Sequence, residues 1–252
     1  MIKGLYAAAT GMMAIEGRQD VIANNIANVS TPGFRRQEPI QKGFYDLFVQ
    51  KLTRPIRFRL DSAPGGGVKL DETFTDLSPG IITATDNPLN IALSGPGFLV
   101  VDTPGGERYT RSGKLLVDAD GQLATPEGFK LLGAGGAPIA AGGGNLLILE
   151  NGTVTVDGEA AGTLQLVEFE QANMLTHLGE GLYVASAAAL ERSGPAERTT
   201  VTHKALEMSN VNLPKETIAL LLGARAYAAN QRVINAIDET AGQVIERVGM
   251  PA

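Results

Sequence analysis

Two stretches of the chain, one near each end, repeat apolar residues with the period of an α-helix. The first repeat advances by alternating steps of three and four, with Gln19 as its one polar member: Leu5, Ala8, Met12, Ile15, Ile22, Ile26 and Val29. The second advances in the same way, with Gln231 and Asp238 as polar members: Leu220, Ala224, Tyr227, Ile234, Ala241, Ile245 and Val248. Such narrow seams are typical of helices that pack against a partner helix, so we expect a coiled-coil-like pair.

Residues that start or stop helices mark the limits of both stretches. They are Thr31, Pro32 and Gly33 after the first repeat, Asn212 and Pro214 before the second, and Gly249 and Pro251 after it. Proline moves the preceding residue out of the helical region, glycine permits a sharp exit, and asparagine with a nearby proline suits a helix start. The pattern predicts helical segments at residues 1–34 and 206–252.

Between these segments the pattern changes to short apolar or alternating runs separated by turn dipeptides. The turn signals include Pro79-Gly80, Gly105-Gly106, Asp120-Gly121, Glu127-Gly128, Asn151-Gly152 and Asp157-Gly158. Runs such as "GFLVV", "TVTV" and "LQLVEF" lie between them. Short strands between regular turns indicate an all-β domain, which we place at residues 79–205. The predicted fold class is therefore α+β, with this domain inserted between two long helices.

The remaining segment, residues 35–78, is broken by Pro39, Pro55 and Pro64 and ends in glycines. We expect an extended connector, with one strand as a further option. Basic residues alternate here with phenylalanines, and they are Arg35, Arg36, Lys42, Lys51, Arg54, Arg57 and Arg59. This mixture is the nearest thing in the chain to a nucleic-acid patch. A solvated or subunit-facing connector is favoured instead, because the rest of the chain is acidic.

The composition is that of an ordinary globular chain with an uneven charge. Its 252 residues are 44% apolar and 19% charged, which suits one generous domain or two small ones. Residues 1–60 hold nine basic and four acidic residues, a net charge of +5, and the rest hold 12 and 23, a net charge of −11. Parts of opposite sign can attract each other within a chain or between copies. The acidic total argues against nucleic-acid binding.

The start of the chain and its cysteine content exclude several further features. There is no cysteine, so disulfides and thiolate chemistry are excluded. The apolar run up to Ile15 is followed by Glu16, Gly17 and Arg18 rather than by a small-residue cleavage site, so we expect no cleaved signal peptide. No apolar run approaches the ~20 residues of a membrane span, because Arg225 interrupts even the run near the C-terminus. We therefore expect no membrane insertion.

We find no constellation of residues typical of catalysis, cofactor binding or metal binding. His177 and His203 have no Asp, Glu or Cys at ligand spacing. The run "DADGQ" resembles the start of a calcium loop, but Leu123 and Phe129 stand where such a loop needs Gly and Glu, so we expect a hairpin turn. The Gly-rich run at residues 133–145 lacks the G-x-G-x-x-G register and is expected to be a flexible loop. The sequence predicts no enzyme, no cofactor and no metal site.

Several motifs, in the same order along the chain, resemble the flagellar basal-body rod and hook protein family. The N-terminal motif is "DVIANNIANVSTPGFRRQ" and the C-terminal motif is "LEMSNVNLPKETIALLLGARAYAANQRVI". Between them, "NPLNIALSGPGFLVV", "RYTRSGKLLVDADGQLATPEGFKLLG" and "GEGLYVAS" resemble the β domain of the same family. One β domain in 252 residues is most similar to two subgroups, the distal rod protein and its proximal-side relative. The basic stretch "LTRPIRFRLD" departs from the distal rod pattern.

This resemblance implies a structural subunit rather than an enzyme. Family members are exported unfolded through the flagellar type III apparatus and polymerise helically into a hollow rod or hook that spans the periplasm. Their terminal helices line the tube and the β domain lies outside. The implied partners are copies of the same chain, other rod and hook proteins and the export apparatus; contact with peptidoglycan or a bushing ring is left open. The residues that match the family motifs, and are thus implied in assembly, are Asn24, Asn25, Asn28, Thr31, Pro32, Gly33, Phe34, Ser209, Asn210, Asn212, Arg225, Tyr227 and Asn230.

Asparagine is a poor helix former, costing roughly 0.5 kcal/mol against alanine, so three asparagines near the end of the first helix need a reason. We hypothesise that Asn24, Asn25 and Asn28 hydrogen-bond to adjacent subunits or to the chain's own turn, and that Phe34 anchors the connector. Two other functions remain as alternatives: a stand-alone secreted binding module or enzyme that uses the β domain, and a nucleic-acid binder that uses the basic connector.

Overall fold

The computed structural model describes residues 2–43 and 68–249, which divide into two compact units. The helical unit is drawn from residues 1–27, 37–74 and 212–252, as far as these are described. The β unit is drawn from residues 28–36 and 75–211. The β unit is thus discontinuous in sequence, because residues 37–74, which lie between its two segments, are assigned to the helical unit.

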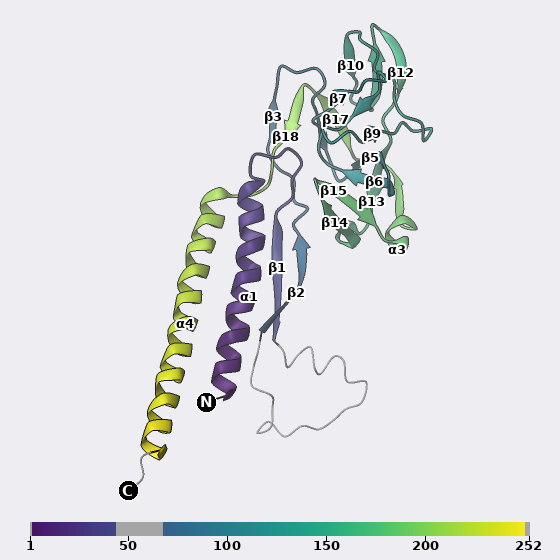
Figure 1. Cartoon of the computed structure of the whole chain (residues 1–252). Helices are drawn as coiled ribbons and strands as arrows, with labels where there is room; N and C mark the ends of the chain where they lie inside the picture. The colour runs from purple at the N-terminus through teal and green to yellow at the C-terminus, as the bar shows by residue number, and fades with distance from the viewer. Residues whose placement is uncertain (1, 44–67, 250–252) are drawn as a thin grey trace. The chain divides into compact units, whose positions relative to one another are not determined.

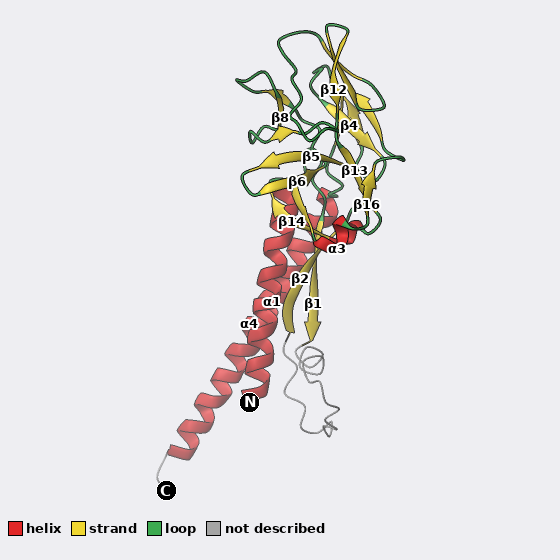
Figure 2. Ribbon diagram, turned by 90° about the vertical axis from the view of Figure 1, so that its right-hand side faces the viewer, coloured by secondary structure: helices red, strands yellow, loops and turns green. Residues whose placement is uncertain are grey.

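The helical unit contains α1 (Ile2–Ala27) and α4 (Leu213–Gly249), which run side by side in opposite directions (Figures 1 and 2). Three glycines mark close approaches between them. A Cβ added at Gly4 would lie 3.5 Å from Ile237, one at Gly11 would lie 3.3 Å from Asn230, and one at Gly223 would lie 3.3 Å from Gln19. The polar side chains of Gln19 and Asn230 therefore each face a glycine of the opposite helix. Neither helix, over its described residues, is long and apolar enough to cross a membrane.

The inner face of α4 matches the predicted seam at four positions and differs from it by one residue at three others. From Leu220 on, the half-buried residues are Leu220, Gly223, Tyr227, Asn230, Ile234, Ile237 and Ala241. The predicted members Ala224, Gln231 and Asp238 are exposed, and the residue before each of them takes its place. Ile237 thus replaces the polar Asp238, and Asn230 replaces Gln231 as the one polar side chain of the face. The sequence pattern allowed two overlapping stripes, and only one of them faces α1.

The helix ends follow the predicted signals, although at different residues. α1 ends at Ala27, where Thr31 donates its backbone N–H to Asn28 O (3.1 Å). α4 begins at Leu213, after Asn212, whose side-chain oxygen accepts the backbone N–H of Lys215 (3.0 Å). This is the N-cap arrangement expected of asparagine. Residues 206–212, predicted as part of the last helix, instead hold the end of a strand and a short link.

The described parts of the predicted connector form two strands rather than the single strand that was left open. β1 (Gln37–Gly43) pairs with β2 (Val68–Thr75) in a two-stranded sheet. The basic residues from Lys51 to Arg59 lie outside the described residues, so the prediction for them stays a prediction.

The β unit is made of short strands, and its largest sheet among the described residues has nine. The sheet order is β14-β15-β6-β5-β9-β8-β7, with β13 pairing both β5 and β16. The strands of this sheet are β5 (Phe98–Thr103), β6 (Gly106–Thr110), β7 (Leu116–Val117), β8 (Leu123–Ala124), β9 (Lys130–Leu131), β13 (Leu166–Phe169), β14 (Leu175–Gly179), β15 (Leu182–Ala185) and β16 (Ser193–Pro195). Their register pairs are antiparallel.

Three smaller sheets complete the β unit. They pair β10 (Leu146–Ile148) with β11 (Thr153–Val156) and β12 (Glu159–Thr163), β4 (Ile91–Ser94) with β17 (Thr200–His203), and β3 (Ile82–Ala84) with β18 (Ala205–Glu207). Two short helical turns, η2 (Ala172–Met174) and α3 (Ala187–Leu190), lie beside β14 and β15 in sequence.

Strand β5 separates two apolar cores. Successive side chains of a strand point to opposite faces, and both faces of β5 are buried. Leu99 and Val101 belong to one core with Ile91, Leu131 and others, whereas Phe98 and Val100 belong to a second core with Tyr109, Phe169 and Tyr183. The continuous apolar run "GFLVV" therefore reflects a strand that is covered on both sides.

The turn predictions succeed and the flexible-loop prediction fails. Asp157 and Gly158 both have positive φ, 52° and 89°, as a two-residue hairpin turn between β11 and β12 requires. The run "DADGQ" forms the expected turn between β7 and β8. The Gly-rich run at residues 133–145 is packed into the β unit rather than forming an open loop, because Ile139 and Ala141 are buried in the core and Ile139 O accepts the backbone N–H of Leu123 (2.9 Å).

Candidate functional site

The side chain of Asn25, on the last turn of α1, forms hydrogen bonds with both the backbone N–H and the backbone C=O of one residue of β1. Its Oδ1 accepts the backbone N–H of Gln37 (2.9 Å) and its Nδ2 donates to Gln37 O (2.8 Å). Nδ2 also lies 3.5 Å from Oε2 of Glu216, which is buried in the first turn of α4. Asn25 is only 1% exposed, so these are the interactions of a buried amide. This one residue thus holds α1, β1 and the start of α4 together within the helical unit.

The motif turn after α1, residues 28–34, is held by contacts inside the β unit. Thr31 donates its hydroxyl to Asn28 Oδ1 (3.1 Å), and Gly33 donates its backbone N–H to Glu207 O (2.7 Å). Gly33 has a φ of +73°, and a Cβ there would lie 2.5 Å from the backbone of Arg111 and of Ser112. Glycine is therefore required twice at this position, for its left-handed conformation and for the close approach of another backbone segment.

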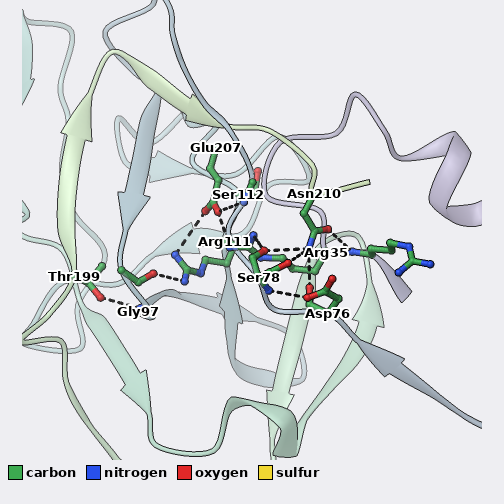
Figure 3. Close-up of polar contacts among 12 residues, drawn as sticks. Arg35, Asp76, Ser78, Gly97, Arg111, Ser112, Thr199, Glu207 and Asn210 are labelled. Carbon is green, nitrogen blue, oxygen red and sulfur yellow. Dashed lines mark hydrogen bonds and ion pairs between the residues drawn. The ribbon is translucent and has the colours of Figure 1, made fainter. Parts of the chain in front are cut away.

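Directly after this turn, Arg35 enters a buried polar cluster that we call the junction (Figure 3). Its Nη2 lies 2.6 Å from Oε1 of Glu207, and its Nη1 donates to Ser78 O. Oε1 of Glu207 also accepts the backbone N–H of Gly80 (3.0 Å). Arg35 and Glu207 are each 1% exposed, so the pair is removed from water. Arg35 was predicted to lie in a solvated or subunit-facing connector, and its burial overturns that prediction.

A second arginine faces the same carboxylate. Arg111 Nη1 lies 3.6 Å from Glu207 Oε2, Arg111 Nη2 donates to Gly95 O, and the guanidinium lies 5.1 Å from the centre of the Phe98 ring. Burial lowers the pKa of Arg111 to about 10, although Glu207 acts in the opposite direction. The group therefore stays charged at neutral pH, and two buried cations share one buried anion.

Asn210 ties three segments of the β unit to one another. Its Oδ1 accepts the backbone N–H of Arg36 (2.7 Å), and its Nδ2 donates to Asp76 O (2.9 Å) and Ser78 O (3.0 Å). The backbone N–H of Ser78 donates to the Asp76 carboxylate (3.0 Å), and this bond is the main reason that the pKa of Asp76 is lowered, with Arg36 and Arg35 adding to the effect. Figure 3 shows these groups converging from segments that are far apart in the sequence.

An aromatic cluster lies next to the junction in the β unit. The Phe34 ring, 3% exposed, meets His177 edge-on at 6.2 Å, and His177 meets Tyr183 at 5.2 Å. Burial lowers the pKa of His177 and raises the pKa of Tyr183 to about 12. Phe34 thus packs against β14 through His177, which in turn contacts Tyr183 of β15.

The structure separates the family-motif residues into two groups. Asn24, Asn25, Asn212, Arg225, Tyr227 and Asn230 belong to the helical unit, and Asn28, Thr31, Pro32, Gly33, Phe34, Ser209 and Asn210 belong to the β unit. Asn24 and Arg225 are exposed, whereas Tyr227 and Asn230 are half-buried on the α1 side of α4. Ser209 accepts the backbone N–H of Val211 through its hydroxyl (3.2 Å). The motif turn and the segment before α4 meet at the Glu207 and Asn210 contacts.

Sequence reasoning missed Gln37, Ser78, Arg111, Glu207 and Glu216. Glu207 and Glu216 both lie within the C-terminal motif, so their position was a signal, but a single carboxylate in a sequence gives no indication of burial. Ser78 contributes its backbone, which side-chain patterns do not report. The described residues contain no group of three or more His, Cys, Asp or Glu that could hold a metal ion. The cluster positions backbone segments and keeps its charged atoms covered.

Three family models match the chain, and the outer two meet in the structure. Residues 5–35 match "Flagella basal body rod protein", residues 92–156 match "Flagellar hook protein FlgE/F/G D1 domain", and residues 203–247 match "Flagellar basal body rod FlgEFG protein C-terminal". Arg35 closes the first match and Glu207 lies in the third, so their ion pair joins the two. Together these matches define the class as that of flagellar rod and hook proteins.

Similarity to whole proteins narrows the class to a family. The flagellar basal-body rod protein FlgG of Caulobacter vibrioides is 32% identical over 94% of this chain and 96% of its own length. FlgF of Escherichia coli is 30% identical over 99% of this chain and 100% of its own, and FlgG of Bacillus subtilis is 28% identical over 97% and 98%. The chain belongs to the flagellar basal-body rod protein family, which locates it in the basal body of the flagellum.

Proposed function

We propose that the chain is a structural subunit of the flagellar rod, which polymerises helically into a hollow shaft that transmits torque from the motor to the hook. In this proposal α1 and α4 pair as a coiled coil and pack against the helices of neighbouring subunits, while the β unit forms the outer part. Its partners are further copies of the chain and the other rod and hook proteins. The relatives named FlgG and FlgF are similarly distant, at 32% and 30% identity, so the proposal covers both positions along the rod.

The exposure of α4 is the observation that carries the proposal. Among the described side chains of this helix, only Glu216 is buried. Ile218, Leu221 and Leu222 are 59%, 53% and 57% exposed. A helix of 37 residues with one face on α1 and large apolar residues elsewhere leaves more apolar surface in water than a soluble monomer normally does. Copies of the same helix pair are the simplest cover for it.

Deletion of the gene tests the proposal. We expect cells that lack it to lose swimming, and isolated basal bodies from them to stop before the hook; a plasmid copy of the gene restores both. A deletion strain that swims and carries complete rods would show that the chain is not a rod subunit.

A further inference from the structure

The face of α4 turned away from α1 carries a line of charges. Arg225, Arg232, Glu239 and Glu246 follow one another at steps of seven residues, and all four are exposed. Seven residues make about two helical turns, so these side chains lie nearly in one row. Each of the first three follows a residue that faces α1 (Gly223, Asn230 and Ile237) by two positions, which is about 200° around the helix. The row therefore lies opposite the α1 contact.

This charged row forms no ion pair among the residues that the structure describes, 2–43 and 68–249. An exposed apolar stripe runs beside it, made of Ile218, Leu222, Ala226, Ala229, Val233, Ala236 and Val244. The stripe advances by steps of three and four for most of its length, as a helix-packing face does. α4 thus has a second packing face, flanked by charges of both signs.

The order of the charges favours one axial offset between two parallel copies of α4 over others. Without an offset, Arg lies beside Arg and Glu beside Glu. An offset of seven residues creates one opposite pair and two like pairs. An offset of 14 residues sets Arg225 beside Glu239 and Arg232 beside Glu246 of the other copy, with no like pair, and it keeps the apolar stripe in register because it is two heptads. At 1.5 Å per residue the offset is about 21 Å.

We propose that the outward face of α4 binds α4 of a second copy of this chain, parallel to it and offset by 14 residues, with Arg225 and Arg232 of one copy against Glu239 and Glu246 of the other. The parallel direction rests on the proposed function, because copies in a rod point the same way. Such a contact is heterologous, and it continues from copy to copy instead of closing on itself. An antiparallel pair, which would match the same charges in a closed dimer, is the competing arrangement.

Cysteine cross-linking measures the offset directly, since the chain has no cysteine of its own. Leu222 and Ala236 are exposed on the stripe and lie 14 residues apart. We expect concentrated full-length Leu222→Cys and Ala236→Cys chains, mixed and oxidised, to give a mixed disulfide in at least ~tenfold greater yield than Leu222→Cys mixed with Ala229→Cys. The double variant Leu222→Cys/Ala236→Cys should give a ladder of linked oligomers. A dimer from Ala236→Cys alone, or no preference between the pairs, overturns the offset.

Charge exchange provides the second arm. The variants R225E/R232E and E239R/E246R each carry a row of one sign, and we expect both to lower the assembled fraction at least ~tenfold, because like charges face each other. The variant with all four changes has the composition of the wild type and restores opposite pairs, so it should assemble again. Equal assembly by all variants overturns the inference. If wild-type cells swim and deletion cells do not, the rod proposal stands whatever the cross-links show.

Discussion

Arg35 and Glu207 lie 172 residues apart in the sequence and form a 2.6 Å ion pair in which each side chain is 1% exposed. The pair connects the turn that leaves α1 with the segment that leads into α4, inside the β unit. Removing one partner of a buried pair leaves the other charge uncompensated, which is far more costly than the net value of the pair. The consequences of the junction can therefore be measured.

Arg35→Ala should destabilise the β unit by about 3–5 kcal/mol, because Glu207 stays buried with its main partner removed. Hydrogen exchange of the β5 amides, which open with the unit, reports this loss. Arg192→Ala, at an exposed position of the same unit, serves as the control and should change stability by less than about 0.5 kcal/mol. If the two variants behave alike, the ion pair does not stabilise the unit.

Gly33→Ala should cost more than Gly128→Ala, although both glycines have positive φ, 73° and 91°. Each substitution should lower the stability by about 1–2 kcal/mol, because an L-residue is strained in the left-handed backbone conformation. At Gly128 a Cβ meets nothing within 4 Å, whereas at Gly33 it would lie 2.5 Å from the backbone of Arg111. Chemical denaturation of both variants should show an additional loss for Gly33→Ala of at least about 2 kcal/mol. Equal losses would show that the turn can move away from Arg111.

Asn25→Ala should expose the Gln37 amide to exchange. Both backbone groups of Gln37 lose a partner, at about 1–3 kcal/mol per unsatisfied buried group, so its exchange should quicken by roughly ten- to a hundredfold. The matched control is Asn24→Ala, since Asn24 is exposed on the same turn. An unchanged Gln37 amide in the Asn25 variant contradicts the role assigned to this asparagine.

Acid should destabilise the β unit through His177. Burial lowers the pKa of His177 in the folded chain below the usual 6.5, so the unfolded chain takes up its proton first as the pH falls. The contribution of His177 to stability is therefore complete above about pH 6.5 and declines between that pH and the folded pKa. The chain has two histidines, so NMR titration resolves both. His177→Phe should flatten the decline; a His177 resonance that titrates at or above 6.5 contradicts the argument.

The sequence predicts the features that depend on local chemistry. Helix periodicity, the Asn212 cap and the Asp157-Gly158 turn act over a few residues, and each is found in the structure. The α4 face was predicted correctly at Leu220, Tyr227, Ile234 and Ala241 and one residue away at its other three positions. The seam with two polar exceptions fitted the pattern almost as well as the seam with Gly223 and Asn230.

The junction could not be predicted, for a different physical reason. Arg35 stands in a run of basic residues, and a run of this kind is usually solvated. Its burial depends on Glu207 and on the Ser78 carbonyl, which only the tertiary fold brings near. The Gly-rich run at residues 133–145 was misjudged similarly, because glycines give no sign that Ile139 fills the core. The structure explains two of the asparagines, Asn25 and Asn210, because their side chains hydrogen-bond to backbone groups. A sequence pattern does not show which backbone groups will lie near a given side chain.

Electron cryo-microscopy of basal bodies, isolated from the bacterium that carries this gene, tests the central claim most directly. The account predicts that density in the wall of the rod fits the side chains of α1 and α4, repeated by the helical symmetry of the shaft, with neighbouring α4 helices parallel. A rod whose density is fully explained by other chains, with this chain absent from it, would contradict the account.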